Sequence, residues 1–457
     1  MSGEAAAAAL QVQAPAHPYR SDLARLARLA GPVVASRLGI MTMGLTDTIV
    51  VGRYSAEQLG CMALAWAVTS SVLSSALGLL SGVQVMASRS LGEGKPAGAG
   101  AALRRGVVYG LWIGVVSAAV LALGGPPLLM ALGLKGGLAE GAAAPLIILA
   151  ISMPSFTLST SAGAWLEGLG RTTPPMLLMW IANLLNLAVD LVLVPGGFGV
   201  HAMGAAGAAT ATCLGRTFLA VSTLGYIAWM KDSRRLGVFE RPAPSRPLES
   251  EQRRIGYGAA ASAFFETTAF ASMNVVAGWI GPLAVAAWAV ALNMAALIFM
   301  VPLGLATATA VMVARSFGAG DGPGLHRAAL LGFAVTAVFG VAVGLAVWPC
   351  AGLLAPIYTS DPGAIALAAS ALVLSCLFYL PDGLQVVAAQ ALRARGDVLV
   401  PSCTHLASYV VVMLPLAYVL AIPAGWGITG ILVAAIIAAY VSAGLLLGRF
   451  WMLSRRD

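Results

Sequence analysis

The chain has 457 residues, of which 59% are hydrophobic and 10% are charged, with a mean hydropathy of +0.89. A soluble core cannot enclose so much apolar surface, so the composition excludes an ordinary soluble protein and predicts an integral membrane protein. The net charge of +8 does not indicate nucleic-acid binding, because the basic residues lie between apolar runs and form no patch interleaved with aromatics.

The chain begins with a stretch rich in alanine and proline, residues 1–25. This stretch lacks an apolar core ending at a cleavage site, so it does not read as a signal peptide, and we expect a disordered cytoplasmic tail. The five cysteines are scattered without paired spacing. They indicate neither a disulfide framework nor a cysteine-bound metal.

Apolar runs then follow one another along the chain. A membrane-spanning helix needs about 20 mostly apolar residues, and twelve runs meet this requirement. The sequence therefore predicts an all-α integral membrane protein with twelve transmembrane helices. The predicted spans are 27–51, 59–86, 106–125, 141–165, 176–197, 206–230, 256–280, 284–311, 328–349, 364–391, 401–422 and 428–450.

The basic residues predict the orientation of these spans. Arg37 and Arg216 lie inside spans, and Arg53 and Lys135 lie in one set of loops. The other Lys and Arg residues lie at or near the termini and the opposite loops. Because basic loops stay in the cytoplasm, we expect both termini and the linker 231–255 to be cytoplasmic, and the protein to lie in the inner cell membrane.

The linker divides the spans into two sets of six that resemble each other. VMASRSLGEG at 85–94 is similar to VMVARSFGAG at 311–320. Six spans per copy give repeats of parallel topology, and two such lobes can enclose a cavity that opens to either side by rocking. The expected segments are an N-lobe at 26–230, a C-lobe at 256–450 and a cytoplasmic tail at 451–457. Two lobes in one chain form the cavity without a partner, so a monomer is expected.

Four acidic residues lie deep in the predicted spans: Asp47, Asp190, Glu266 and Asp382. A charge at the bilayer centre costs about 2.5–3.5 kcal/mol on insertion scales, so such groups face the protein interior and mark ion paths, proton relays or counter-charges for ligands. A buried carboxyl group can carry a proton, and a carboxylate also suits a hard cation such as Na⁺. Both alternatives stay open.

Polar neighbours accompany these acids, since residues three or four apart share a helix face. By this rule Asn183, Asn186 and Asp190 form a polar stripe on one helix, and Asp382 shares a face with Gln385. Such stripes must face another helix or a water-filled cavity, because lipid cannot satisfy them.

Several motifs, in this order and position, make residues 20–450 resemble the multidrug and toxic compound extrusion (MATE) family, and its NorM branch in particular. The motifs are GPVVASRLGIMTMGLTDTIVVGR (31–53), WLEGLGRTTPPM (165–176), NLLNLAVDLVLVPGGFGVHAMGAAGAATAT (183–212), FFETTAF (264–270), VARSFGAG (313–320) and PDGLQVVAAQALRARGD (381–397). The resemblance implies two six-helix lobes that form a V around a central cavity, and cation-driven export of drugs.

The resemblance also assigns residues. Asp47 matches the family's acid in the first helix, and Glu266 and Asp382 match acids of the NorM branch. Arg37 stands where NorM-like chains commonly have glutamine. The residues expected to couple cation movement are Asp47, Asn186, Asp190, Glu266 and Asp382, with Asp47, Asn186 and Asp190 as candidate Na⁺ ligands. The residues expected to line the substrate cavity are Thr46, Arg37, Asn183, Asn293, Gln385 and Met43.

The predicted activity is therefore secondary antiport by alternating access of two lobes. Inward movement of H⁺ or Na⁺ would drive out amphipathic, cationic organic compounds across the lipid bilayer. The sequence has no GxxxxGK[ST] stretch for ATP, and no cofactor is expected.

Three alternatives were weighed against this reading. A flippase for a lipid-linked substrate would line its cavity with basic residues, whereas the spans hold four acids against Arg37 and Arg216. A membrane-embedded transferase would need clustered aspartates or a His/Asp set, and the four histidines have no HxxxD or DxxxD partner. A channel would conduct far faster than a rocking carrier, and flux measurements distinguish the two.

Overall fold

The computed structural model describes residues 18–131, 137–197, 199–241, 245–358 and 361–455. Within these ranges the elements are helical, apart from one isolated bridge between Gly197 and Val200. All twelve predicted spans lie on helices, except for a few terminal residues. The apolar runs therefore predicted the elements correctly, because each run is long enough to cross a bilayer as one helix.

The first six spans form the N-lobe. Its helices are α2 (Pro18–Tyr54), α3 (Ala56–Gly92), α4 (Pro96–Ala131), α5 (Leu138–Ile151), α6 (Met153–Leu169), α7 (Thr173–Leu193) and α8 (Ala205–Trp229). The fourth span is a bent pair, since α5 and α6 meet at 41° around Ser152.

The last six spans form the C-lobe. Its helices are α9 (Arg246–Ile280), α10 (Pro282–Gly318), α11 (Gly322–Tyr358), α12 (Pro362–Ala394), α13 (Leu399–His405), the π-helix η1 (Leu406–Met413), α14 (Leu414–Ala421) and α15 (Ile428–Ser454). Here the fourth span, α12, is one continuous helix. The fifth span instead changes winding, from α13 through η1 to α14. The two copies of the repeat therefore differ in where a helix is interrupted.

Three helix ends differ from the predicted segments. Helix α2 begins at Pro18 inside the predicted tail, α9 begins at Arg246 inside the predicted linker, and α15 extends to Ser454. A proline in the first turn of a helix has a favourable φ and needs no N–H partner there, which permits α2 and α9 to start before their apolar runs. The rest of the predicted N-terminal tail, residues 1–17, lies outside the described residues.

Nine helices of the described chain are long and apolar enough to cross a membrane, and the bent pair of α5 and α6 makes a tenth. Helices α8 and α9 are not among them, because they carry Arg216, Glu266 and several threonines. Helix α8 packs against α5, α6 and α7, so its polar side chains can meet protein instead of lipid.

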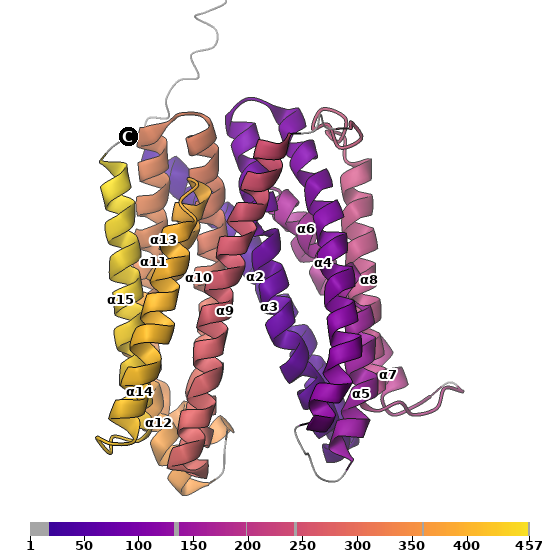
Figure 1. Cartoon of the computed structure of the whole chain (residues 1–457), viewed down its shortest axis with the longest axis vertical. Helices are drawn as coiled ribbons and strands as arrows, with labels where there is room; N and C mark the ends of the chain where they lie inside the picture. The colour runs from indigo at the N-terminus through magenta and orange to yellow at the C-terminus, as the bar shows by residue number, and fades with distance from the viewer. Residues whose placement is uncertain (1–17, 132–136, 198, 242–244, 359–360, 456–457) are drawn as a thin grey trace, which may run out of the picture.

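Figure 1 shows the two lobes as separate bundles that meet at one end and diverge towards the other, in a V. We call the first end, where α15 finishes and α9 starts, the basic end, and the other the far end. Helix α3 packs against α9 and α10, and α2 packs against α10. One hydrophobic cluster contains residues of both lobes, among them Leu26 and Val85 with Val311 and Leu392.

Glycines bring the lobes into close contact near the basic end. A Cβ atom on Gly82 of α3 would lie 2.1 Å from the carbonyl oxygen of Gln252 in α9. A Cβ atom on Gly256 of α9 would lie 2.1 Å from the carbonyl oxygen of Leu79. Small residues let membrane helices approach until their backbones touch, so α3 and α9 are held together by backbone contact.

Two arginines from equivalent positions of the repeat join the lobes at this end. Arg89 donates from Nη2 to the carbonyl oxygen of Ala394, at the C-terminal end of α12, over 3.1 Å, and also pairs with Glu251. Arg315 donates from Nη2 to the carbonyl oxygen of Leu169, at the C-terminal end of α6, over 3.3 Å. Each arginine thus caps a helix of the opposite lobe, where the last carbonyl groups lack partners and the helix dipole favours a cation.

The same symmetry relates two further glycines. A Cβ atom on Gly92 would lie 2.1 Å from the carbonyl oxygen of Arg315, and one on Gly318 would lie 2.3 Å from the carbonyl oxygen of Arg89. Replacing either glycine by alanine therefore forces the lobes apart at the basic end.

We expect Gly92→Ala together with Gly318→Ala to lengthen the distance between the lobes at the basic end by about 1 Å, since carbon atoms pack at about 3.5–4.0 Å. Spin labels at the exposed positions Lys231 and Trp451, on a cysteine-free background, report this distance by pulsed electron resonance. Gly444→Ala is the control, because no atom lies within 4 Å of its added Cβ. An unchanged distance in the double variant would contradict the contact.

Candidate functional site

The N-lobe holds a buried polar cluster centred on Asp47. Asn186 of α7 donates from Nδ2 to Asp47 Oδ1 over 3.1 Å, and Thr212 of α8 donates from Oγ1 to Asp47 Oδ2 over 2.6 Å. The side chains of Asp47, Asn186 and Thr212 are all fully buried. Two other helices, α7 and α8, therefore each donate one hydrogen bond to the carboxylate of α2.

Helix packing brings these groups together. Helix α7 packs against both α2 and α8, and its polar stripe faces them. Asn183 donates from Nδ2 to the carbonyl oxygen of Gly39 in α2 over 3.0 Å, which fixes the stripe against α2. Gly39 permits this approach, because a Cβ atom there would lie 2.7 Å from the Cγ of Met179. Asn183 thus joins two helices.

Asp190 completes the cluster as a second carboxylate. It is fully buried, and neither of its oxygens has a hydrogen-bond partner among the described residues. It lies close enough to Asp47 for the two charges to repel each other. Two adjacent buried carboxylates cannot both ionise unless a cation joins them, so the pair can take a proton. Carboxylate, amide and hydroxyl oxygens also suit a hard cation such as Na⁺.

Arg216 supplies a fixed positive charge in the same lobe. It donates from Nη1 to Ser152 Oγ over 2.7 Å, at the bend between α5 and α6. Its guanidinium lies over the rings of Phe156 and Trp66, 5.1 Å and 5.6 Å from their centroids. It also attracts Asp47 electrostatically. The cluster around Asp47 therefore has two acids, and Arg216 is the base near it.

The C-lobe brings together its own pair of acids. Gln385 of α12 donates from Nε2 to Glu266 Oε1 of α9 over 3.2 Å. Asp382 precedes Gln385 on α12, is 7% exposed, and is repelled by Glu266. Glu266 itself is half-buried. The structure therefore brings Glu266 of α9 together with Asp382 and Gln385, which the sequence placed on one face of another helix.

Other predicted cavity residues are engaged elsewhere. Arg37 forms an ion pair with Glu167 of α6, with 3.3 Å between Nη2 and Oε1. Thr46 donates to the carbonyl oxygen of Thr42 in its own helix. Met43 is buried in the small apolar cluster between α2, α7 and α8. These contacts account for the three side chains structurally, and their roles in a cavity stay predictions.

Asn293 is exposed and donates to the carbonyl oxygen of Ala289 in its own helix, α10. It is not among the residues that hydrogen bonds connect to the acids of either lobe. Its predicted place in the substrate cavity also stays a prediction.

Sequence reasoning missed several polar residues. Thr212 lies one turn before Arg216 on α8, and this spacing could have revealed it. Arg393 lies just beyond the predicted end of its span, yet it is buried in the C-lobe. His405 lies within the predicted span 401–422, and only 3% of it is exposed. Arg393 and Glu167 lie just beyond predicted span ends and are buried, so they add one base and one acid to the four acids and two bases inside the predicted spans.

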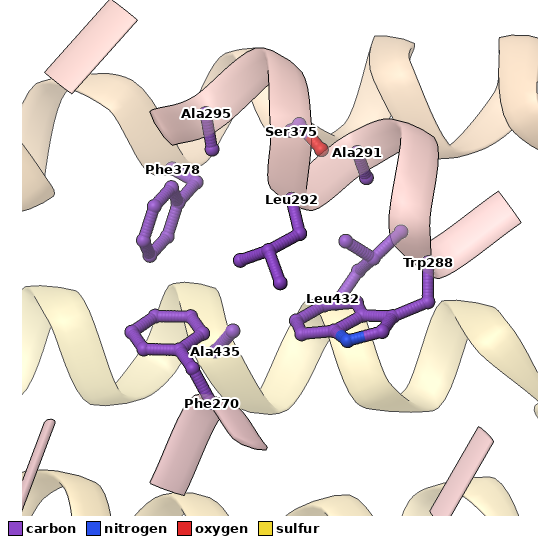
Figure 2. A pocket seen from close by; sticks show the side chains of 9 residues that line it. All are labelled: Phe270, Trp288, Ala291, Leu292, Ala295, Ser375, Phe378, Leu432 and Ala435. Carbon is purple, nitrogen blue, oxygen red and sulfur yellow. The ribbon is translucent and has the colours of Figure 1, made fainter. Parts of the chain in front are cut away.

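A small apolar cavity lies beside the C-lobe acids, on their far-end side. Its volume is about 20 Å³. Figure 2 shows the rings of Phe270, Trp288 and Phe378 lying around Leu292. Phe270 follows Glu266 by one turn on α9. Apart from Ser375, the residues that line this cavity are thus aromatic or aliphatic.

We expect Thr212→Val to lower cation-coupled transport about tenfold, because a bond to a charged group contributes about 1.5–3 kcal/mol and 1.4 kcal/mol corresponds to tenfold. Transport by purified protein in liposomes measures the change. Thr210→Val is the matched control on the same helix, since its hydroxyl donates only to the carbonyl oxygen of Ala206. Equal transport in both variants would show that the bond to Asp47 is dispensable.

Comparison with known proteins assigns the family. The MatE family description matches residues 32–192 and again residues 259–419, one copy in each lobe. The chain is 55% identical to the "Probable multidrug resistance protein NorM" of Caulobacter vibrioides over 457 residues, covering 100% of this chain and 97% of that one. It is 30% identical to "Multidrug resistance protein PmpM" of Pseudomonas aeruginosa over 400 residues, covering 87% and 84%.

The fold agrees with solved structures. A MATE crystal structure in the bent conformation superposes with a TM-score of 0.87 at 22% identity, covering 96% of this chain and 97% of that one. The two lobes, their duplicated sequence match and the NorM-named relative all lead to the same assignment: the chain belongs to the MatE family.

Proposed function

We propose that this protein is a multidrug efflux antiporter, which exports amphipathic organic cations in exchange for H⁺ or Na⁺. The names of its relatives, multidrug resistance proteins NorM and PmpM, support the substrate class. The observation that carries the proposal is the buried pair Asp47 and Asp190, whose negative charge must be neutralised by a cation.

Competition at this pair couples the two movements. With a proton or Na⁺ bound, the pair has less charge to attract an organic cation, and the organic cation in turn displaces the inorganic one. A ligand shifts a conformational equilibrium only through its different affinity for the two states. The inward cation gradient therefore drives export if the outward-facing state takes up the inorganic cation.

The placement in the membrane follows from charge. With the basic loops in the cytoplasm, the basic end faces the cytoplasm, both termini lie there, and the inner membrane surrounds the helices. The contacts of Arg89 and Arg315 then close the cytoplasmic side, and the lobes diverge towards the outside (Figure 1). The structure corresponds to the outward-facing state of the proposed cycle.

The flippase alternative requires free positive charge between the lobes. Arg37 is paired with Glu167, and Arg216 is held by Ser152 and two aromatic rings. Both guanidinium groups already have protein partners, which favours a cationic substrate over an anionic one.

Uptake of an organic cation into liposomes, with a pH gradient and a Na⁺ gradient imposed separately, tests the function. We expect one gradient to drive uptake and the other to have little effect. Uptake that is independent of both gradients would refute antiport, and flux at channel rates would refute a carrier.

We expect Asp47→Asn to lower gradient-driven uptake at least about tenfold, because the neutral amide cannot hold the cation while it keeps the side chain's shape. Asp232→Asn is the control, since Asp232 forms a surface ion pair with Arg171 outside the cluster, and such pairs contribute little. Full uptake by a normally folded Asp47→Asn variant would remove Asp47 from the coupling mechanism.

A further inference from the structure

Behind the acids of the C-lobe lies a second group of buried polar side chains that the proposed exchange does not use. Helices α9, α12, α13 and η1 contribute them. We call this group the polar column; its members are Ser262, Arg393, His405, Ser408 and Tyr409. No sequence motif marks it, because the five residues come from four elements.

His405 and Tyr409 are the least satisfied members. His405 is 3% exposed and Tyr409 is fully buried, and neither the two ring nitrogens nor the phenol oxygen has a partner among the described residues. The two rings pack edge to face, 5.7 Å apart, which accounts for the ring surfaces but not for the polar atoms. Buried polar groups almost always have a partner, either protein or ordered water, since an unpaired one costs several kcal/mol.

Arg393 links this pair to the acids. It donates from Nη2 to Ser262 Oγ over 2.6 Å, while its Nε has no partner among the described residues. It attracts Glu266 and repels a charged His405, so it lies near both. Tyr409 in turn lies near Glu266.

The column follows the helix axes towards the basic end. With a rise of 1.5 Å per residue, Arg393 lies about 16 Å nearer that end than Asp382 on α12. Ser262 lies one turn nearer than Glu266 on α9. His405 lies one turn nearer than Tyr409. At the end itself, Asp397 and Arg449 form a 2.7 Å ion pair that reaches solvent.

One of the spans that contribute to the polar column, the fifth span of the C-lobe, is not a regular α-helix. Ser408 and Tyr409 lie in η1, the π-helical segment, whereas α7, its counterpart in the N-lobe, is a regular α-helix. Wider π turns occur often at functional sites. Ser408 Oγ is likewise buried without a partner among the described residues.

The chemistry of the column selects its occupant. Arg393 repels a metal cation, and Glu266 repels an anion. Water can donate to His405 and accept from Tyr409 and Arg393. Towards the far end the apolar cavity of Phe270 and Phe378 interrupts any such chain (Figure 2), because cavities lined by apolar groups stay dry.

We propose that the polar column is a water-filled proton route inside the C-lobe, which connects Glu266 and Asp382 with the basic end. It serves the antiport proposed above when the coupling ion is H⁺. A proton leaves the carboxyl group of Glu266 for a neighbouring water and passes Tyr409. At His405, one ring nitrogen accepts a proton and the other releases one to the next water. The proton thus reaches the basic end, which the proposed orientation places in the cytoplasm.

Two groups from other elements lie near His405. Arg393 of α12 repels a charge on it, and Tyr409 of η1 packs against its ring and itself lies near Glu266 of α9.

Hydroxyl-radical footprinting of the wild-type protein in lipid nanodiscs tests for the water itself. We expect radiolytic labelling of Tyr409 and His405, because radicals form from water bound beside them. Trp165 is the control: it is also fully buried, but its Nε1 donates to the carbonyl oxygen of Ala99. Tyr409 and His405 as unlabelled as Trp165 would overturn the proposal.

Transport measurements on variants of His405 and Tyr409 test whether protons use this route. We expect His405→Leu and Tyr409→Phe to lower uptake of tetraphenylphosphonium driven by a pH gradient at least about tenfold, while exchange of labelled for unlabelled compound at equal pH stays near the wild-type rate. Tyr409→Phe keeps the ring packing, so it tests the route even if His405→Leu misfolds. Tyr418→Phe, at an exposed tyrosine of α14, is the control.

The outcomes separate the two proposals. A wild-type protein that responds to neither gradient refutes antiport. A wild-type protein that responds to Na⁺ alone refutes the proton route and leaves antiport standing. A response to the pH gradient that His405→Leu and Tyr409→Phe retain in full also refutes the route.

Discussion

The cost of burying a carboxylate in a membrane determines much of this structure. Asp47 has two hydrogen-bond donors from two other helices, and Glu266 has Gln385. Each lobe is packed so that its acids face protein, since lipid would not tolerate them. In each lobe a second acid, Asp190 or Asp382, lies near the first, and these hydrogen bonds do not remove the repulsion between the two carboxylates. A pair of adjacent carboxylates is stable only with a proton or a cation, and this requirement is the basis for proposing a cation site in each lobe.

The two lobes share a fold but not a site. The N-lobe acids lie towards the far end, since Asp47 is close to the end of α2, whereas Glu266 lies near the middle of α9. In the N-lobe the fifth span is a regular helix with an amide and a carboxylate on one face. In the C-lobe it contains η1 and carries a histidine and a tyrosine. Gene duplication thus kept the scaffold, and the polar groups moved to different depths.

The contact between the lobes follows the symmetry of the repeat, although the acid clusters of the two lobes differ. Arg89 and Arg315 each cap a helix of the other lobe, and Gly92 and Gly318 each touch the arginine's backbone. Such a contact consists of few hydrogen bonds and flat glycine surfaces, which can separate without unfolding either lobe. A rocking carrier needs an interface of this kind, because each half must move as a rigid unit.

The sequence by itself determined the membrane class, the twelve spans, the repeat and the acids, because hydropathy and helical spacing are local properties of the chain. It also showed that Asn186 and Asp190 share a face. Only the tertiary structure decided that Thr212 reaches Asp47, that Arg37 pairs with Glu167, and that His405 and Arg393 are buried together. These pairs join helices far apart in sequence, and helix rotation and packing, which no local pattern encodes, bring them into contact.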